Sequence, residues 1–321
     1  MKEPLITHMY TADPSAHVFE GKLYIYPSHD LDDHPNRPAP DDLGSQFDMV
    51  DYHVFSMENM QTPPVDHGEV LNVKDVPWAE KQMWAPDAAF KNDTYYLYFP
   101  ALDREGIFRI GVATSKSPAG PFKAEPDYIQ GSFSMDPCVF VDDDGQAYMY
   151  FGGLWGGQLE KWQTGTFDPD GQVPGRREPM LGPRVARMSE DMLSFDGPVE
   201  EVSILDENGE PVTVGDQDRL FFEASWMHKY NGTYYFSYST GFSRHLAYAT
   251  GTSPTGPFTF QGYILSPVLG WTTHHSIVEF QGKWYLFYHD ATLSGGVDYM
   301  RNIKVAELIY NADGTIEAME P

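Results

Sequence analysis

The stretch Phe222-Glu-Ala-Ser-Trp226 continues as Met227-His-Lys-Tyr-Asn-Gly-Thr-Tyr-Tyr-Phe-Ser-Tyr238. An apolar run, an Asn-Gly pair and an aromatic run follow one another here, and this order is the strongest short-range signal for a β-hairpin. The carboxylic acid Glu223 stands where the first predicted strand begins. Because the chain repeats this plan, the stretch decides the fold.

Four other segments share the plan of a functional side chain, a strand, a turn and an aromatic strand. They begin at Asp13, Trp84, Asp136 and His274, and each reaches its turn eight or nine residues later. A second repeat, Ser-Pro-x-Gly-Pro-Phe, follows a third predicted strand at 117–122 and at 253–258. The unit is therefore a four-stranded sheet. Five such units around one axis predict an all-β fold, a five-bladed β-propeller.

Residues 160–200 depart from the repeat, and we expect the outer part of the third blade and a connection there. Over Met188–Phe195 a strand is favoured over a short helix, because Pro183 and the pair Gly197-Pro198 flank it. No low-complexity linker divides the chain. Residues 1–321 are therefore predicted to form a single catalytic domain.

Composition narrows the possible partners. The formal net charge of −26 disfavours binding to nucleic acid or to an anionic membrane surface, whereas a neutral sugar is compatible with it. Cys138 is the single cysteine, which excludes an intrachain disulfide. The sequence contains no apolar stretch of the length of a signal peptide or a membrane span, and this predicts a cytoplasmic protein. It leaves the oligomeric state open, a homo-oligomer included.

Equivalent positions of the blades should converge, because the innermost strand of each blade runs beside the propeller axis. Asp13, Asp136 and Glu223 are thus expected to face one pocket. An Asp-Pro pair by itself is usually a turn former, but three acids in one register favour a functional site. Like charges and burial raise the pKa of at least one such carboxyl group. A protonated carboxylic acid beside an ionised carboxylate is the pair of catalytic groups that glycoside hydrolysis uses.

These motifs resemble those of glycoside hydrolase family 43, five-bladed propeller enzymes that act on xylose- and arabinose-containing polysaccharides. The matching pieces occur in family order as Ala12-Asp-Pro-Ser15, Trp84-Ala-Pro-Asp87, Met135-Asp-Pro137, Phe222-Glu-Ala224 and His274-His-Ser276. The resemblance implies an inverting, single-displacement reaction. In it, Asp13 is the general base, Glu223 is the general acid, and Asp136 orients Glu223 and tunes its pKa.

The resemblance implies three further roles. Trp84 is the apolar platform for a sugar ring. Arg301 reaches the substrate hydroxyls, with a surface ion pair as the alternative. His274 holds a Ca²⁺ ion largely through water, with a histidine that only forms hydrogen bonds as the alternative; calcium prefers oxygen ligands, so such a site must be rich in water. No organic cofactor is expected.

The implied function is that of a β-xylosidase, which releases xylose from the non-reducing end of β-1,4-xylo-oligosaccharides. The main alternative is an α-L-arabinofuranosidase acting on arabinose-containing oligosaccharides. Endo-acting arabinanase or xylanase and a non-catalytic sugar-binding propeller are further alternatives. Two acidic segments are discounted as metal sites: His29–His34 is interpreted as a solvated rim, and Asp142–Gly145 as a hairpin turn.

Overall fold

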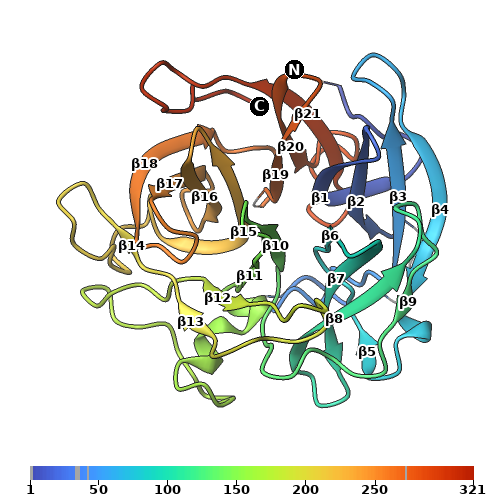
Figure 1. Cartoon of the computed structure of the whole chain (residues 1–321). Coiled ribbons are helices and arrows are strands. Elements are labelled where there is room, and N and C mark those ends of the chain that lie inside the picture. Colours follow the sequence, from blue (N-terminus) through green and yellow to red (C-terminus); the bar gives the residue numbers. More distant parts are fainter. Residues whose placement is uncertain (1–2, 33–36, 42, 272) are drawn as a thin grey trace.

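The computed structural model describes residues 3–32, 37–41, 43–271 and 273–321. In these residues the strands form five sheets around a central axis (Figure 1). This arrangement confirms the all-β, five-bladed propeller. The innermost strands, in blade order, are β1 (Tyr10–Phe19), β6 (Asp87–Lys91), β10 (Cys138–Val141), β15 (Phe221–Tyr230) and β19 (His275–Phe280).

The predicted hairpins supply the second strand of every blade, and the outer strands follow in chain order. Blade one continues with β2 (Lys22–Asp30), β3 (Asp51–Met57) and β4 (Val65–Asn72). Blade two has β7 (Thr94–Asp103), β8 (Phe108–Ser115), β9 (Lys123–Ala124) and the short β5 (Ala79–Lys81). Blade three has β11 (Ala147–Phe151), β12 (Arg184–Arg187) and β13 (Glu200–Glu201).

Blade four consists of β15, β16 (Thr233–Thr240), β17 (Leu246–Gly251) and β18 (Phe258–Leu265), with β14 (Ile204–Leu205) parallel to β18. Blade five consists of β19, β20 (Lys283–Asp290) and β21 (Asn302–Leu308). Three 3-10 helices occur in the described residues: η1 (Val73–Asp75), η2 (Trp155–Gly157) and η3 (Leu159–Trp162). None of the helices in this described part is long and apolar enough to cross a membrane.

The aromatic second strands place tyrosines between the blades. Tyr26, Tyr98, Tyr150, Tyr238 and Tyr288 occupy the second strands of successive blades and are fully buried. The hydroxyl groups of Tyr26, Tyr98 and Tyr150 donate to carbonyl groups of the next blade, because a buried tyrosine hydroxyl needs a partner. Tyr26 donates to the carbonyl of Pro118 at 2.7 Å, and Tyr150 donates to that of Pro254 at 2.5 Å. The repeated Ser-Pro turns thus accept hydrogen bonds that tie neighbouring blades together.

The two ends of the chain join the last blades to their neighbours. The amide of Leu5 donates to the carbonyl of Ile303 in β21 at 2.8 Å, which couples blade one to blade five. The C-terminal segment crosses to blade four, where the amide of Met319 donates to the carbonyl of Ile264 at 2.9 Å.

The segment from Met188 to Phe195 is not the strand that the sequence predicts. It is a turn with an isolated bridge between these two residues. The Asp191 carboxylate accepts from the Ser189 hydroxyl at 2.6 Å and from the Leu193 amide at 3.1 Å, so a side chain replaces the strand ladder as the local partner. The outer part of blade three is where it was expected, in β12 and β13.

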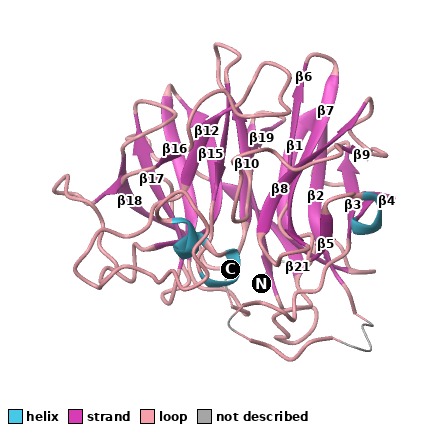
Figure 2. Ribbon diagram, turned by 90° about the horizontal axis from the view of Figure 1, so that it is seen from below, coloured by secondary structure: helices cyan, strands magenta, loops and turns pink. Residues whose placement is uncertain are grey.

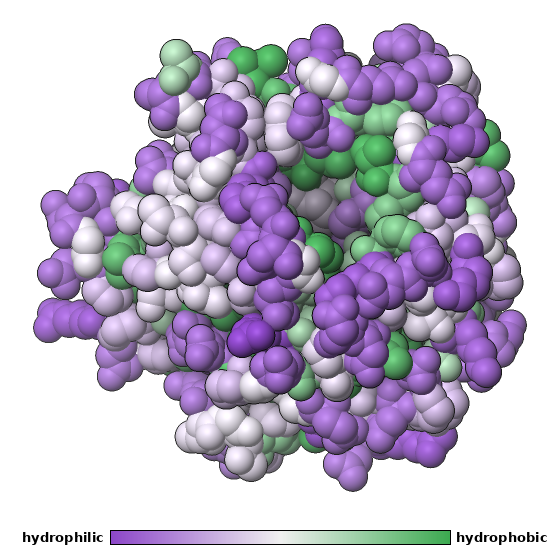
Figure 3. Space-filling model, in the orientation of Figure 1, coloured by the Kyte–Doolittle hydropathy of each residue, from purple (hydrophilic) through white to green (hydrophobic). Residues whose placement is uncertain are grey.

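The two faces of the propeller differ. Figure 2 shows the strands from the side, with long loops gathered at one end of them. The face in Figure 3 is hollowed at its centre and has apolar side chains in the hollow. A cavity of about 360 Å³ lies near the hairpin turns of the innermost strands, and Phe90, Phe140, Trp226 and Trp284 are among its lining residues.

Candidate active site

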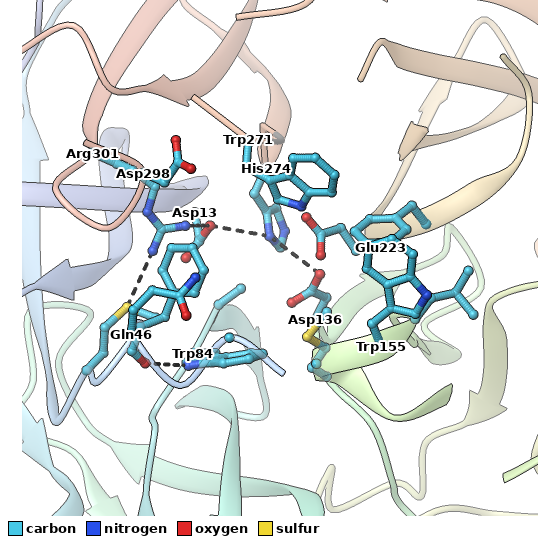
Figure 4. A pocket seen from close by; sticks show the side chains of 18 of the residues that line it. Asp13, Gln46, Trp84, Asp136, Trp155, Glu223, Trp271, His274, Asp298 and Arg301 are labelled. Carbon is cyan, nitrogen blue, oxygen red and sulfur yellow. Dashed lines mark hydrogen bonds and ion pairs between the residues drawn. The ribbon is translucent and has the colours of Figure 1, made fainter. Parts of the chain in front are cut away.

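A second cavity, of about 260 Å³, lies where the innermost strands begin. Residues from all five blades line it, together with residues of the loop between β2 and β3. The structure brings together every site residue expected from the sequence (Figure 4): Asp13, Trp84, Asp136, Glu223, His274 and Arg301.

Local irregularities of the strands aim the acids into this cavity. The β1–β2 ladder is interrupted between Ala12 and Ser15, and Asp13 has a φ of 50°. Asp136 has a φ of 56°, and Ala224, directly after Glu223, has a φ of 64°. Bulges of this kind re-aim a side chain, and a non-glycine residue at positive φ costs about 1–3 kcal/mol. The propeller therefore maintains a strained backbone at the positions of its three acids.

Asp13 is held as an ionised carboxylate. Its Oδ1 lies 3.1 Å from Nη1 of Arg301, and its Oδ2 accepts a hydrogen bond from the Ser28 hydroxyl at 2.6 Å. The backbone amide of Asp13 donates to Nδ1 of His289 at 3.0 Å. Burial alone would raise the pKa of Asp13, but Arg301 and His289 outweigh burial and hold this pKa well below its usual range.

Arg301 is fixed by Asp30 rather than exposed. Its Nε and Nη2 donate to the two oxygens of Asp30 at 2.8 Å and 2.7 Å, and its backbone amide donates to the same carboxylate at 2.8 Å. Its side chain is 12% exposed, and its guanidinium lies 5.0 Å from the centre of the Phe47 ring. The alternative of a surface ion pair is therefore wrong, because Arg301 lines the cavity.

Asp136 and Glu223 lie on the side of the cavity opposite Asp13 (Figure 4). Oδ2 of Asp136 accepts a hydrogen bond from the amide of Ala224 at 2.8 Å, which links the two acid positions through the backbone. Burial and the negative charges of Glu223 and Asp13 raise the pKa of Asp136 well above its usual range. The carboxyl group of Asp136 therefore keeps its proton to a higher pH than an ordinary aspartate does.

His274 lies between the two sides of the site. Its Nδ1 is 3.8 Å from Oδ1 of Asp13 and 3.8 Å from Oδ2 of Asp136. Burial lowers the pKa of His274 to about 4, although the charge of Asp13 opposes the shift, so the ring is neutral at pH 7. His275 contacts blade four instead, with Nε2 2.6 Å from the Ser237 hydroxyl. The two adjacent histidines therefore serve different parts of the fold, as strand alternation requires.

Trp84 forms one wall of the cavity. Its Nε1 donates to the carbonyl of Phe47 at 2.8 Å, and the centre of its ring lies 4.6 Å from that of Phe108. A Cβ added to Gly44 would lie 2.9 Å from the ring, and one added to Gly156 would lie 3.2 Å from it. Glycine at these two positions lets the loop backbones lie against the indole and fixes its orientation.

Sequence reasoning missed the residues that support the acids and those at the rim of the cavity. Ser28 and His289 lie on the second strands of blades one and five, close after the aromatic runs that the repeat reveals. His289 comes directly after Tyr288, and Ser28 comes two residues after Tyr26, so the position relative to the repeated aromatic run is the signal that could have found them. The rim residues lie in loops outside the repeat, where the sequence carries no such signal: Gln46, Phe47, Trp155, Trp271 and Asp298.

The donor groups near His274 suit a water-rich cation site better than a protein cage. Calcium takes six to eight oxygen ligands, and the carboxylates closest to the imidazole are those of Asp13 and Asp136. Asp13 is already occupied by Arg301 and Ser28, and one oxygen of Asp136 by the amide of Ala224. A calcium ion beside His274 would therefore take most of its ligands from water.

In a five-bladed propeller, an ionised aspartate that faces two further carboxyl groups, one of them with a raised pKa, across an aromatic-walled pocket defines a glycoside hydrolase. Residues 65–316 match the family model described as glycosyl hydrolases family 43. The chain belongs to this family.

Proteins similar over their whole length carry names for two activities. The chain is 60% identical over 327 residues to xylosidase/arabinosidase 43A of Humicola insolens, and the alignment covers 99% of both sequences. It is 51% identical to a beta-xylosidase of Xylanibacter ruminicola, covering 97% of both. The structure of CoXyl43, a GH43 β-xylosidase/α-arabinofuranosidase from a compost microbial metagenome, matches with a TM-score of 0.97 and 62% identity, covering 99% of this chain and 97% of that chain. That structure is a calcium-free complex with xylotriose.

Proposed function

We propose that this chain is a β-xylosidase that releases xylose from the non-reducing end of β-1,4-xylo-oligosaccharides and also releases α-L-arabinofuranose at the same site. The observation that supports this activity most directly is that Asp13, whose pKa is lowered, faces Asp136, whose pKa is raised, and Glu223 across one pocket. The paired names of the similar proteins support the two sugars. Both sugars are pentoses, so one small pocket can accept either ring.

In the proposed reaction a water molecule lies between Asp13 and the anomeric carbon. Asp13 takes a proton from this water, whose oxygen attacks the anomeric carbon from the face opposite the leaving group. The glycosidic bond breaks, and Glu223 gives its proton to the departing oxygen. The configuration at the anomeric carbon inverts, and proton exchange with solvent restores both acids.

The other cavity residues serve this step by position and charge. Arg301 keeps Asp13 ionised, and Asp30 keeps Arg301 in place. Asp136 anchors the backbone directly after Glu223 through the amide of Ala224. The Trp84 indole offers an apolar wall to the sugar ring and excludes water from that side.

A calcium ion held by His274 is part of the proposal. His274 would hold it through a neutral ring nitrogen and a shell of water, beside Asp13 and Asp136. Its positive charge would favour the ionised form of Asp13.

Leaving-group dependence tests the assigned roles. An aryl xyloside with a strongly acidic phenol as leaving group needs no proton from the enzyme, whereas xylobiose does. Glu223→Gln should lower kcat on xylobiose by about 10²–10⁴-fold and lower it far less on the activated aryl xyloside. Asp13→Asn should lower kcat on both substrates, because both need an activated water.

Equal losses on both substrates in Glu223→Gln would contradict its role as the acid. Full activity in either variant would contradict the whole mechanism.

Competition between an aryl xyloside and the matching arabinofuranoside tests the shared site, since each should inhibit hydrolysis of the other with an inhibition constant close to its own KM. Stereochemistry of the first-formed sugar, followed by NMR, tests inversion.

A further inference from the structure

A cluster of metal-ligand side chains lies outside the active site, on blade one. His29 is on β2, and Asp51 and His53 are on β3. One potential ligand atom from each of the three lies within 4.8 Å of the others. None of them is among the residues that line the active-site cavity. The sequence interpretation of His29–His34 as a solvated rim groups His29 with its neighbours in the chain. Residues 33–36 lie outside the described part. The fold instead brings His29 next to β3.

The distances within the cluster are close to those around a single ion. Nδ1 of His29 lies 2.6 Å from Oδ1 of Asp51, and the centres of the His29 and His53 rings are 5.2 Å apart. Two ligands at about 2.1 Å from one zinc ion lie roughly 3.4 Å apart. Small rotations of side chains would therefore bring all three ligand atoms to coordination distance. In these rotations His29 and Asp51 would move slightly apart, and His53 would move closer to both.

The surroundings favour a cation and hold the imidazoles. Oδ1 of Asp66, on β4, lies 3.3 Å from Nδ1 of His53, and its other oxygen lies 2.8 Å from Nε2 of His8. Carboxylates beside metal-binding imidazoles orient the ring and increase its basicity. The His29, Asp51 and His53 side chains are 19%, 11% and 18% exposed, so an ion can reach them from solvent and still be partly sheltered.

We propose that His29, Asp51 and His53 form a binding site for a divalent transition-metal cation, best matched by Zn²⁺. Two imidazoles and one carboxylate are typical zinc ligands, whereas calcium and magnesium prefer sites built from oxygen alone. Water or the Asp66 carboxylate completes the coordination.

The proposed ion would clamp β2 to β3 next to the groups that support catalysis. Ser28 and Asp30, the neighbours of His29 on β2, hold Asp13 and Arg301 respectively. Ser28 pairs with Tyr52 of β3, which stands between Asp51 and His53. Cross-linking the two strands at this point stabilises the native state by the free energy of metal binding, as for any ligand that binds only the folded chain.

Metal titration of the full-length chain after treatment with chelator tests the site. We expect one Zn²⁺ per chain at this cluster by calorimetry, a rise in Tm with Zn²⁺, and a visible absorption band when Co²⁺ is used as the probe. His53→Ala should weaken Zn²⁺ binding by tenfold or more and abolish both the Tm rise and the Co²⁺ band. Asp51→Asn is a second variant with the same expected losses, should His53→Ala fail to fold.

Two control variants locate the ion. His67→Ala removes a neighbouring histidine that binds the Ser56 hydroxyl and lies outside the cluster, so it should leave the Zn²⁺ response intact. Asp136→Asn removes an active-site carboxylate and should also leave it intact. A Zn²⁺ response that persists in His53→Ala and Asp51→Asn, or one that disappears in Asp136→Asn, would overturn the proposal. So would the absence of any Zn²⁺ binding by the wild-type chain.

Discussion

The guanidinium of Arg301 binds both oxygens of Asp30, at 2.8 Å and 2.7 Å, and still lies 3.1 Å from Oδ1 of Asp13. The buried Asp30 carboxylate thus fixes the Arg301 guanidinium, which in turn keeps the Asp13 carboxylate ionised. Because the fork is planar and rigid, a lysine could not serve both acids in the same geometry.

Arg301→Lys should shift the acid limb of the pH profile to higher pH. Arg301 lowers the pKa of Asp13, so a weaker partner raises that pKa and the base becomes protonated at a higher pH. The kcat/KM of an aryl xyloside, measured from pH 3 to pH 8, should lose its acid-side plateau in the variant. An unchanged acid limb would show that another group controls the ionisation of the base.

Asp136→Asn should shift the alkaline limb of the same profile to lower pH. The negative charges of Asp136 and Glu223 hinder each other's ionisation, so Glu223 should lose its proton more easily once Asp136 is removed. We expect kcat on xylobiose to fall and the alkaline limb to move down. An alkaline limb at the wild-type position would contradict the electrostatic coupling between Asp136 and Glu223.

The same variant should be more stable than the wild type at neutral pH. The pKa of Asp136 in the folded chain lies above its unfolded value of about 3.9, so Asp136 contributes stability below that pH and loses this contribution as the pH rises through the folded pKa. Asparagine does not titrate and can still accept from the Ala224 amide. The Tm of Asp136→Asn minus that of wild type should therefore be larger at pH 7 than at pH 4. A difference that is equal at both pH values would contradict the raised pKa.

Trp84→Ala should weaken substrate binding more than it slows the chemistry. The indole forms a wall of the sugar pocket but lies outside the group of acids. We expect KM to rise by roughly tenfold, about 1.4 kcal/mol of lost sugar contact, with a smaller change in kcat. Because Trp84 is buried, Trp84→Phe is the matched variant that keeps an aromatic face. A fall in kcat with an unchanged KM would contradict the platform role.

Removal of calcium should lower activity, and adding calcium should restore it. A calcium ion held by His274 would favour the ionised form of Asp13, so the chelated chain should also show an acid limb at higher pH. His274→Ala should abolish the response to calcium, whereas His53→Ala should keep it. Identical activity with chelator and with added calcium would favour a histidine that only forms hydrogen bonds.

Sequence repeats and their register were sufficient to predict the propeller and the convergence of Asp13, Asp136 and Glu223. The reason is physical: a repeated hairpin with one functional residue in a fixed register has to place that residue at the axis in every blade. The sequence could not place the segment from Met188 to Phe195, where a side-chain turn competes with the strand. A single domain and a cytoplasmic location stay predictions.

The tertiary structure decided what depends on residues far apart in the chain. The pairing of Asp30 with Arg301 spans 271 residues, and only the contact of blade five with blade one creates it. The lowered pKa of Asp13 and the raised pKa of Asp136 likewise follow from burial and from neighbours in other blades. The grouping of His29 with Asp51 and His53 depends on the β2–β3 pairing. The sequence alone determined which residues meet at the axis, because the spacing from each functional residue to its hairpin turn can be recognised in the sequence. The charge states of these residues depend on the fold, because electrostatic interactions act through space between residues that are far apart in the chain.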